Sequence, residues 1–315
     1  MTRLAAFNPA VKTLDESIAR AKAAERLGYE SVWLSQLPDA RDASLVVAAY
    51  AAATERVKFG TGVLPIYTRH PTAMVQMAAT LDEMSGGRFI LGLGVSHKVT
   101  VESMWGLHLD QPVEAMREYL TIVQTSLADG GCSFEGKYFS AQWSYSAPRP
   151  PKLPVMIAAL SSRMLDLAGE LTDGVVLWMC APNYIRDHVV PIVKAARERV
   201  GKSLEGFEIV AHVPVCLTSD RAAALEAFRP TVSRYSNLPY YRKVLDAAGY
   251  KEQLDAGNIT EGMLDDFAGI GDEQQIRAAI QRYREAGLTL PAAGPFSGHK
   301  GAAGFEATLE AAAGS

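Results

Sequence analysis

Eight short apolar runs recur along the chain and alternate with stretches of helical spacing. The first four, at residues 3–7, 31–34, 57–63 and 88–94, begin about 30 residues apart, and four more follow at residues 154–159, 174–179, 208–217 and 288–292. Runs that are apolar throughout are typical of strands buried on both faces, and parallel strands need helical crossovers. Eight such units predict an α/β fold, a closed (β/α)8 TIM barrel.

The first stretch between two apolar runs is predicted to be a helix. Apolar residues recur on one helical face between residues 14 and 27. Thr13 and Glu16 have the spacing of a reciprocal N-terminal cap, and Gly28 is expected to end the helix.

The whole chain, residues 1–315, is expected to form one barrel domain, because its length and its 48% apolar content allow one large core. Two intervals are longer than the repeat and predict insertions near residues 98–153 and 218–270. The first should hold a helix near residues 113–127 and a hairpin or ordered loop at 134–145. The second should hold a helix after Ser219 and a Tyr-rich piece at 235–241, before the final helix of the chain near Asp272. Such excursions cover the active face of a barrel and are expected to form the substrate pocket.

An open, doubly wound sheet would also alternate strands and helices. Its usual signature, a G-x-G-x-x-G turn after the first strand, is missing, because that strand ends in Phe7-Asn8-Pro9. The closed barrel is therefore preferred.

Composition argues against several classes of partner. The net charge of −4 and the scattered Lys and Arg residues give no field for nucleic acid. No secretory signal is recognised at the N-terminus, and no apolar stretch reaches the roughly 20 residues that span a bilayer. Cys132, Cys180 and Cys216 are far apart, odd in number and outside metal-ligand spacing, so we expect a cytoplasmic protein with inert thiols and no metal site.

The expected strand ends contain few acidic residues. A glycosidase needs two facing carboxylates, and a metallohydrolase needs a group of His and Asp ligands. The strand ends supply mainly Gly, Ser and small apolar residues, which allow backbone to approach a flat ligand. An organic cofactor is therefore expected in place of hydrolytic chemistry.

Two strand ends could receive an anion. Around Ser161-Ser162-Arg163 a strand is followed by a helix, whose N–H groups, dipole and Arg charge could converge on a phosphate, although either serine could be an ordinary N-cap. After the fourth strand, Ser96 could donate to a phosphate and His97 could exchange protons near neutrality, although a lone His is often structural.

Several motifs resemble the luciferase-like oxidoreductases, most closely the branch that depends on the deazaflavin coenzyme F420. They are residues 61–65 (TGVLP), 69–71 (RHP), 81–88 (LDEMSGGR), 91–97 (LGLGVSH), 168–174 (AGELTDG) and 271–273 (GDE). The resemblance runs from the first strand to the helix near Asp272, and the third and fourth strands carry its most specific motifs.

The resemblance implies a TIM barrel with a non-prolyl cis peptide between Gly62 and Val63, in a bulge that backs the deazaflavin ring. It also implies that the coenzyme phosphate and ribityl chain lie near Ser96 and His97 and near the turn from Leu160 to Met164. The predicted cofactor-binding residues are Gly62, Val63, Ser96, His97, Leu160, Ser161, Ser162, Arg163 and Met164.

The sequence departs from the family pattern at two positions. Relatives that act on sugar phosphates have a motif similar to Ser-Asp-His after the second strand, where this chain has Ser35-Gln36-Leu37. They also carry a carboxylate at the position of His97. The substrate and proton-transfer residue of those relatives are therefore not transferred to this chain.

Hydride transfer between coenzyme F420 and a small organic substrate is the leading hypothesis, with His97 as the catalytic proton-transfer candidate. Tyr67 and His70 are further candidates, each with a structural alternative. An FMN-dependent monooxygenase is the second hypothesis, and a cofactor-binding protein without turnover is the third. A homodimer is expected from the family, and the apolar stripe of Met74, Met77, Leu81 and Met84 predicts core or a subunit contact.

Overall fold

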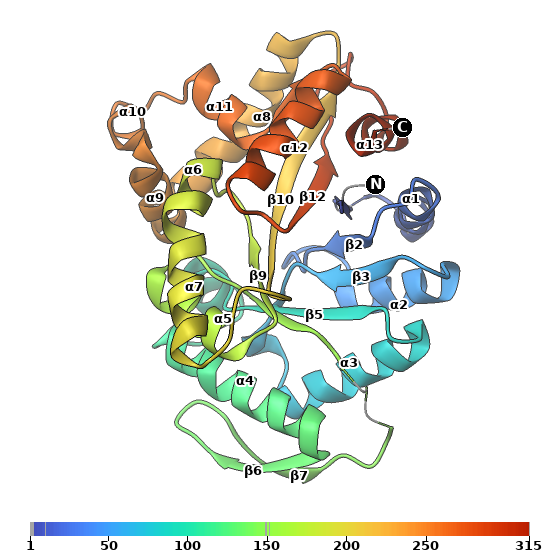
Figure 1. Cartoon of the computed structure of the whole chain (residues 1–315), viewed down its shortest axis with the longest axis vertical. Coiled ribbons are helices and arrows are strands. Elements are labelled where there is room, and N and C mark those ends of the chain that lie inside the picture. The colour runs from blue at the N-terminus through green and yellow to red at the C-terminus, as the bar shows by residue number, and fades with distance from the viewer. Residues whose placement is uncertain (1–2, 10, 149, 151, 315) are drawn as a thin grey trace.

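The computed structural model describes residues 3–9, 11–148, 150 and 152–314, and it confirms the TIM barrel (Figure 1). Its eight strands are β1 (Ala5–Phe7), β2 (Ser31–Leu34), β3 (Lys58–Thr61), β5 (Phe89–Gly94), β8 (Val155–Ala158), β9 (Gly174–Leu177), β10 (Glu208–Leu217) and β12 (Leu290–Pro295). Each strand is parallel to the next in this order, and β12 pairs with β1, so the sheet has no open edge. All eight apolar runs of the sequence are strands.

Helices surround this barrel and connect its strands. The longer ones are α1 (Leu14–Arg26), α2 (Ala43–Ala53), α3 (Pro71–Ser85), α4 (Pro112–Asp129), α5 (Ser162–Leu171), α7 (Val190–Arg199), α8 (Arg221–Ser236), α12 (Glu273–Glu285) and α13 (Phe305–Ala313). Among the described residues, no helix is both long enough and apolar enough to cross a membrane.

The start of α1 follows the sequence prediction in part. The Thr13 hydroxyl accepts a hydrogen bond from the Glu16 amide at 3.1 Å, and Gly28 takes a left-handed φ of 77° just beyond the helix. The prediction that the Glu16 side chain in turn caps the helix is wrong. The Glu16 carboxylate instead accepts a hydrogen bond from Arg20, one turn along the helix, at 2.9 Å. An i,i+4 ion pair on the helix surface has displaced the backbone contact.

The first insertion contains α4 and an antiparallel hairpin of β6 (Gly131–Glu135) and β7 (Ser140–Ser144), which lies beneath α4 at the bottom of Figure 1. The Glu118 carboxylate on α4 accepts hydrogen bonds from three successive backbone amides of the hairpin turn, at 137–139, with distances of 2.7–2.9 Å. The predicted helix and hairpin are both present, and this carboxylate holds them together.

The second insertion lies at the opposite end of the view and includes α8, α9 (Pro239–Leu245), α10 (Lys251–Asp255), α11 (Glu261–Phe267) and the short strand β11 (Gly269–Gly271) (Figure 1). The helix predicted after Ser219 is α8, and the Tyr-rich piece runs from the end of α8 into α9. The helix predicted near Asp272 is α12, which Asp272 caps. The C-terminal helix α13 was not predicted.

Two strands differ in their bounds from the apolar runs that predicted them. The third run ends as β3 at Thr61, and the chain then bulges before a two-residue strand, β4 (Leu64–Pro65), which resumes pairing with β5. The last strand begins two residues later than expected and continues to Pro295, beside the long strand β10. Short turns of 3-10 or π type occupy Ile66–Thr68, Val99–Met104, Ile185–Val189 and Asp246–Tyr250.

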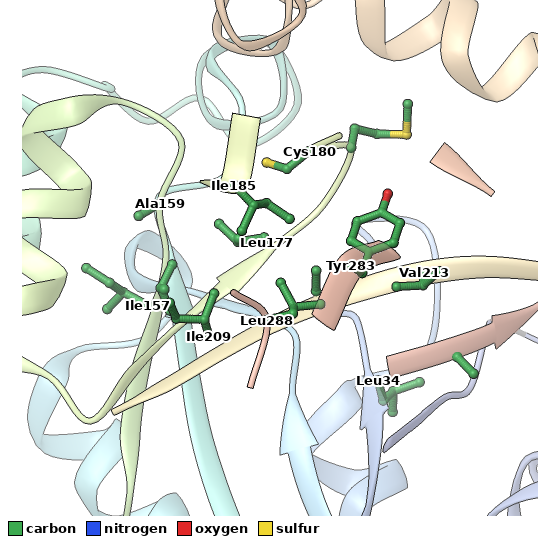
Figure 2. Close-up of a cluster of buried hydrophobic side chains, with 14 of the residues drawn as sticks. Leu34, Ile157, Ala159, Leu177, Cys180, Ile185, Ile209, Val213, Tyr283 and Leu288 are labelled. Atoms are coloured by element: carbon green, nitrogen blue, oxygen red, sulfur yellow. The ribbon is translucent and has the colours of Figure 1, made fainter. Parts of the chain in front are cut away.

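Apolar side chains from the strands pack against the surrounding helices, as Figure 2 shows for Leu34, Ile157, Leu177 and Ile209. Fully burying one such side chain contributes roughly 1.5–3 kcal/mol. Cys180 belongs to the same cluster, and burial raises the pKa of its thiol to about 12. The thiol therefore stays protonated at neutral pH, as the inert interpretation of this cysteine requires.

Strand β5 approaches the 61–63 segment so closely that only glycine fits at one position. A Cβ added to Gly92 would lie 1.8 Å from the carbonyl oxygen of Thr61. The Thr61 hydroxyl accepts a hydrogen bond from the Gly92 amide at 2.8 Å and donates one to its carbonyl at 2.9 Å. This contact ties the third strand of the barrel to the fourth.

The substitution Gly92→Ala should therefore destabilise the protein by about 2–3 kcal/mol, because the new methyl group meets backbone that cannot move aside. Denaturant unfolding measures the loss. Gly262→Ala is the matched control, since its Cβ would meet nothing closer than 4.0 Å and Ala stabilises a helix by up to about 1 kcal/mol relative to Gly. Equal stability of Gly92→Ala and the wild type would contradict the close approach.

Candidate active site

A cavity of about 1250 Å³ opens at the carboxyl ends of the barrel strands. Its lining includes Asn8 after β1, Ser35 after β2, Ser96 after β5, Leu160 after β8 and Trp178 after β9. This is the end at which TIM barrels carry their active sites. The volume exceeds that of a usual single-ligand pocket, about 300–1,000 Å³, so the cavity has room for a cofactor and a substrate together.

The bulge after β3 forms part of the cavity wall. The peptide bond between Gly62 and Val63 is cis, as the family resemblance implied. The Gly62 amide donates to the Leu34 carbonyl at 2.8 Å, and the Ser35 hydroxyl donates to the Gly62 carbonyl at 2.6 Å. The neighbouring strand β2 thus holds the bulge on both sides of Gly62, and Val63 lines the cavity.

The structure brings all of the predicted cofactor-binding residues to this one cavity. They come from three separate strand ends, and they are Gly62, Val63, Ser96, His97, Leu160, Ser161, Ser162, Arg163 and Met164. Their shared location agrees with a common ligand, and their role in binding it stays a prediction.

At the start of α5 the structure combines the two interpretations of the serine pair. The Ser161 hydroxyl accepts a hydrogen bond from the Met164 amide at 3.3 Å, so Ser161 is an N-cap. The amides of Ser162 and Arg163 have no hydrogen-bond partner in the part of the chain that the structure describes. Arg163 pairs with Glu114 on α4 at 3.0 Å, which partly neutralises the charge that the sequence suggested for an anion. The two free amides can still bind an anion.

His97 lies half-buried beside the aromatic ring of Tyr241, with 5.8 Å between ring centroids. Burial lowers the pKa of His97 below its ordinary value of 6.5, so the ring is neutral at pH 7. Its nitrogens form no hydrogen bond to a described residue, and the side chain lines the cavity. A neutral imidazole in this position can accept a proton, and its N–H group can donate a hydrogen bond.

A stack of aromatic rings forms another wall. The His212 ring lies between Phe7, at 3.9 Å and nearly parallel, and Trp178, at 4.3 Å. Tyr235 meets Trp178 edge-on at 5.5 Å and Tyr241 at 4.8 Å. The wall continues in this way to His97, and such surfaces suit a flat, conjugated ligand.

His212 is neutral in this stack. Burial between the rings lowers its pKa to about 3, and the Gly294 carbonyl beside it raises the pKa by a smaller amount. His212 was not predicted as a cavity residue, although the alternation of residues along β10 identifies it. Val210, His212 and Pro214 alternate along β10 and all line the cavity, so the period of two in the strand marks the inward face.

Two buried polar atoms at the cavity lack partners among the described residues: the indole nitrogen of Trp178 and the side-chain oxygen of Asn8. Asn8 is fully buried, and its amide group donates to the Ser17 carbonyl at 3.0 Å and to the Tyr50 hydroxyl at 2.6 Å. An unpaired buried donor and acceptor are costly, and such groups are usually satisfied by ordered water or a ligand. Both residues line the cavity, but these two atoms are themselves buried beneath its surface.

The weaker proton-transfer candidates lie elsewhere. His70 contacts the Thr72 hydroxyl at 2.8 Å and the Ser140 carbonyl at 3.2 Å, which connects the start of α3 to the hairpin and supports its structural alternative. Tyr67 does not belong to the cavity lining, and burial raises its pKa to about 12. Neither residue is among the described residues that line the cavity.

The end of β2 contains no titratable group, since the residues there are Ser35, Gln36 and Leu37. The side-chain oxygen of Gln36 accepts a hydrogen bond from the Ala43 backbone amide at 2.7 Å. The side-chain NH₂ group of Gln36 donates to the Leu37 backbone carbonyl at 3.1 Å. Both ends of this side chain are therefore engaged with backbone.

A family model described as luciferase-like monooxygenase matches residues 1–290. The chain belongs to the luciferase-like monooxygenase family. This luciferase-like chain is 27% identical over 289 residues to a 5,10-methylenetetrahydromethanopterin reductase of Methanolobus tindarius, covering 87% of this chain and 88% of the relative. It is 28% identical to a Mycobacterium tuberculosis protein named as a coenzyme F420-dependent oxidoreductase, covering 85% and 87%.

Among solved structures, the coenzyme F420-dependent tetrahydromethanopterin reductase of Methanopyrus kandleri aligns with a TM-score of 0.84. The alignment covers 99% of this luciferase-like chain and 97% of the reductase, at 24% identity. The likeness confirms the fold over nearly the whole chain, insertions included.

The stacked His212 predicts a pH dependence of stability in this luciferase-like protein. Its folded-state pKa lies below the unfolded value of 6.5, so its contribution is present above pH 6.5 and is lost as the pH falls toward 3. Between pH 6 and 4 the wild type should lose about 1 kcal/mol per pH unit more than His212→Phe, which keeps a ring in the stack. Denaturant unfolding across this range measures both, and parallel curves would contradict a neutral, buried His212.

Proposed function

We propose that this protein binds the deazaflavin coenzyme F420 and transfers a hydride between the coenzyme and a small organic substrate. The observation that carries the proposal is the convergence of the Gly62–Val63 bulge and the free amides of α5 on one large cavity. The names of the relatives support it: one is a reductase and another an F420-dependent oxidoreductase.

The residues at the bulge fit a flat tricyclic ring. A Cβ on Gly94 would lie 2.4 Å from the Val63 side chain, so glycine is what lets Val63 occupy its place against the cavity. Val63 presents an apolar surface, and the Ser35 and Ser96 side chains add polar groups to the lining beside it. Apolar contact with a few oriented polar groups is what an organic cofactor requires.

The start of α5 fits the phosphate of the coenzyme. The free amides of Ser162 and Arg163 lie at the positive end of the helix dipole, and both residues line the cavity. The Ser96 hydroxyl at the end of β5 makes no hydrogen bond to a described residue, and it is a second potential donor from the fourth strand.

When bound, the coenzyme would supply the group that donates or accepts the hydride. The residues of the chain would orient the two reactants and keep water from them. His97 would take up the accompanying proton, because it is neutral at pH 7 and Gln36 leaves the end of β2 without a titratable group. Charged catalytic groups are then not required in the cavity.

We also propose that the protein acts in the cytoplasm as a homodimer, as the resemblance implies. Within the predicted apolar stripe, Met74 and Leu81 are buried core residues, whereas Met84 is exposed on α3. Leu45 is exposed on the adjacent helix α2. Such residues fit a subunit contact. A measurement of the molar mass in solution tests whether the protein is a homodimer.

Fluorescence titration of the protein with coenzyme F420, and in parallel with FMN, tests the cofactor directly. We expect saturable binding of F420 and none of FMN. Tight binding of FMN with consumption of oxygen would favour the monooxygenase instead. Tight F420 binding with no turnover on any substrate would favour a binding protein without turnover.

The phosphate position is tested by Ser162→Asp. An acidic residue at the start of a helix stabilises it through the dipole, so the fold should be retained while the added charge repels the phosphate. We expect at least about tenfold weaker binding of F420, against less than about threefold for the control Ser162→Ala. Equal affinities of the two variants would place the phosphate elsewhere.

The role of His97 is tested by the pH profile of turnover. If neutral His97 takes up the proton, activity should fall with decreasing pH at a value below 6.5, because its pKa is lowered. His97→Gln should remove this acidic limb and lower kcat, measured at saturating F420, by about 10²-fold or more. An unchanged limb in the variant would assign it to another group.

A further inference from the structure

Two basic side chains that line the cavity have no acidic partner. Arg234 lies in the last turn of α8 and Lys243 lies on α9, and neither forms an ion pair with a residue that the structure describes. Arg163, by contrast, is paired with Glu114. Asp39 is the one acidic residue in the described cavity lining, so the second insertion gives the mouth of the cavity an excess of positive charge.

The Arg234 side chain is also partly oriented. Its guanidinium carbon lies 5.7 Å from the centroid of the Tyr235 ring, at a distance typical of a cation–π contact. Tyr235 belongs to the aromatic wall and lines the cavity. The positive charge therefore lies next to the surface on which a flat ligand would rest.

The same mouth has exposed apolar side chains. Nine large apolar residues of the described chain are exposed, and four of them line this cavity: Leu37, Val99, Met104 and Tyr240. Val99 and Met104, on the turn after β5, are each 59% exposed. Apolar groups gathered at an opening mark a binding surface more often than isolated ones do, and here they would meet the apolar part of a ligand.

We infer that the substrate is an organic acid with an apolar or aromatic body, whose anionic group is bound by Arg234 and Lys243. Resting on the proposed function, this inference names the class of its substrate. The cations follow β10, whereas the proposed phosphate site follows β8, two strands away in the barrel. The two anions thus have separate sites, and the carboxylate or sulfonate of the substrate lies at the mouth while its body reaches the aromatic wall.

The probe for this site is the fluorescent acid anilinonaphthalene sulfonate, compared with the neutral N-phenylnaphthylamine, which has the same rings without the charge. The double variant Arg234→Gln/Lys243→Gln should bind the acid about tenfold more weakly than the wild type and bind the neutral probe equally well. The matched control Lys22→Gln/Lys202→Gln removes the same charge from exposed sites outside the cavity lining. It should leave both affinities unchanged.

Equal loss of acid binding in the control would overturn the inference, because the effect would then follow net charge and not this site. Equal loss of both probes in the double variant would overturn it too, because the side chains would serve packing. Coenzyme F420 titrated into the same variants separates the two ligands. Weaker F420 binding with acid binding unchanged would assign the cations to the coenzyme and overturn the inference, whereas no F420 binding by the wild type would contradict the proposed function alone.

Discussion

The close approach of strand β5 to the segment after β3 is the contact on which the site depends. Gly92 lets the Thr61 hydroxyl bond both the amide and the carbonyl of one residue, and Gly94 leaves room for the Val63 side chain. The third and fourth strands are thereby joined below the bulge, and the bulge is carried to the cavity wall. A larger side chain at either glycine would displace Val63 from the surface that we assign to the coenzyme ring.

Few charged groups lie near the strand ends that line the cavity, and the guanidinium of Arg163 there is paired with Glu114. The two histidines of the cavity are kept neutral by burial, and the side chain at the end of β2 is an amide. Asn8 and Trp178 add polar but uncharged side chains to the lining. Such surroundings favour a neutral conjugated ring and disfavour hydrolysis, which needs acids or metal ligands. The free charges lie at the mouth, where a substrate enters.

The sequence predicted the barrel well because buried parallel strands leave continuous apolar runs that local pattern detects. The α5 turn was predicted from its residues as well as from the resemblance, whereas the cis peptide was predicted through the resemblance alone. The pairing of Arg163 with Glu114 and the hold of Glu118 on the hairpin were not predicted, because they join segments whose approach depends on the tertiary fold. His212 was missed for another reason: it lies within an apolar run, and only the alternation of inward residues identifies it.

The position of the coenzyme is best determined by a crystal structure of the protein with bound F420. We expect one face of the ring to pack on Val63 at the bulge, and the phosphate to accept hydrogen bonds from the amides of Ser162 and Arg163. This expectation would be contradicted by a ring bound away from the bulge, or by a phosphate held at the mouth by Arg234 and Lys243.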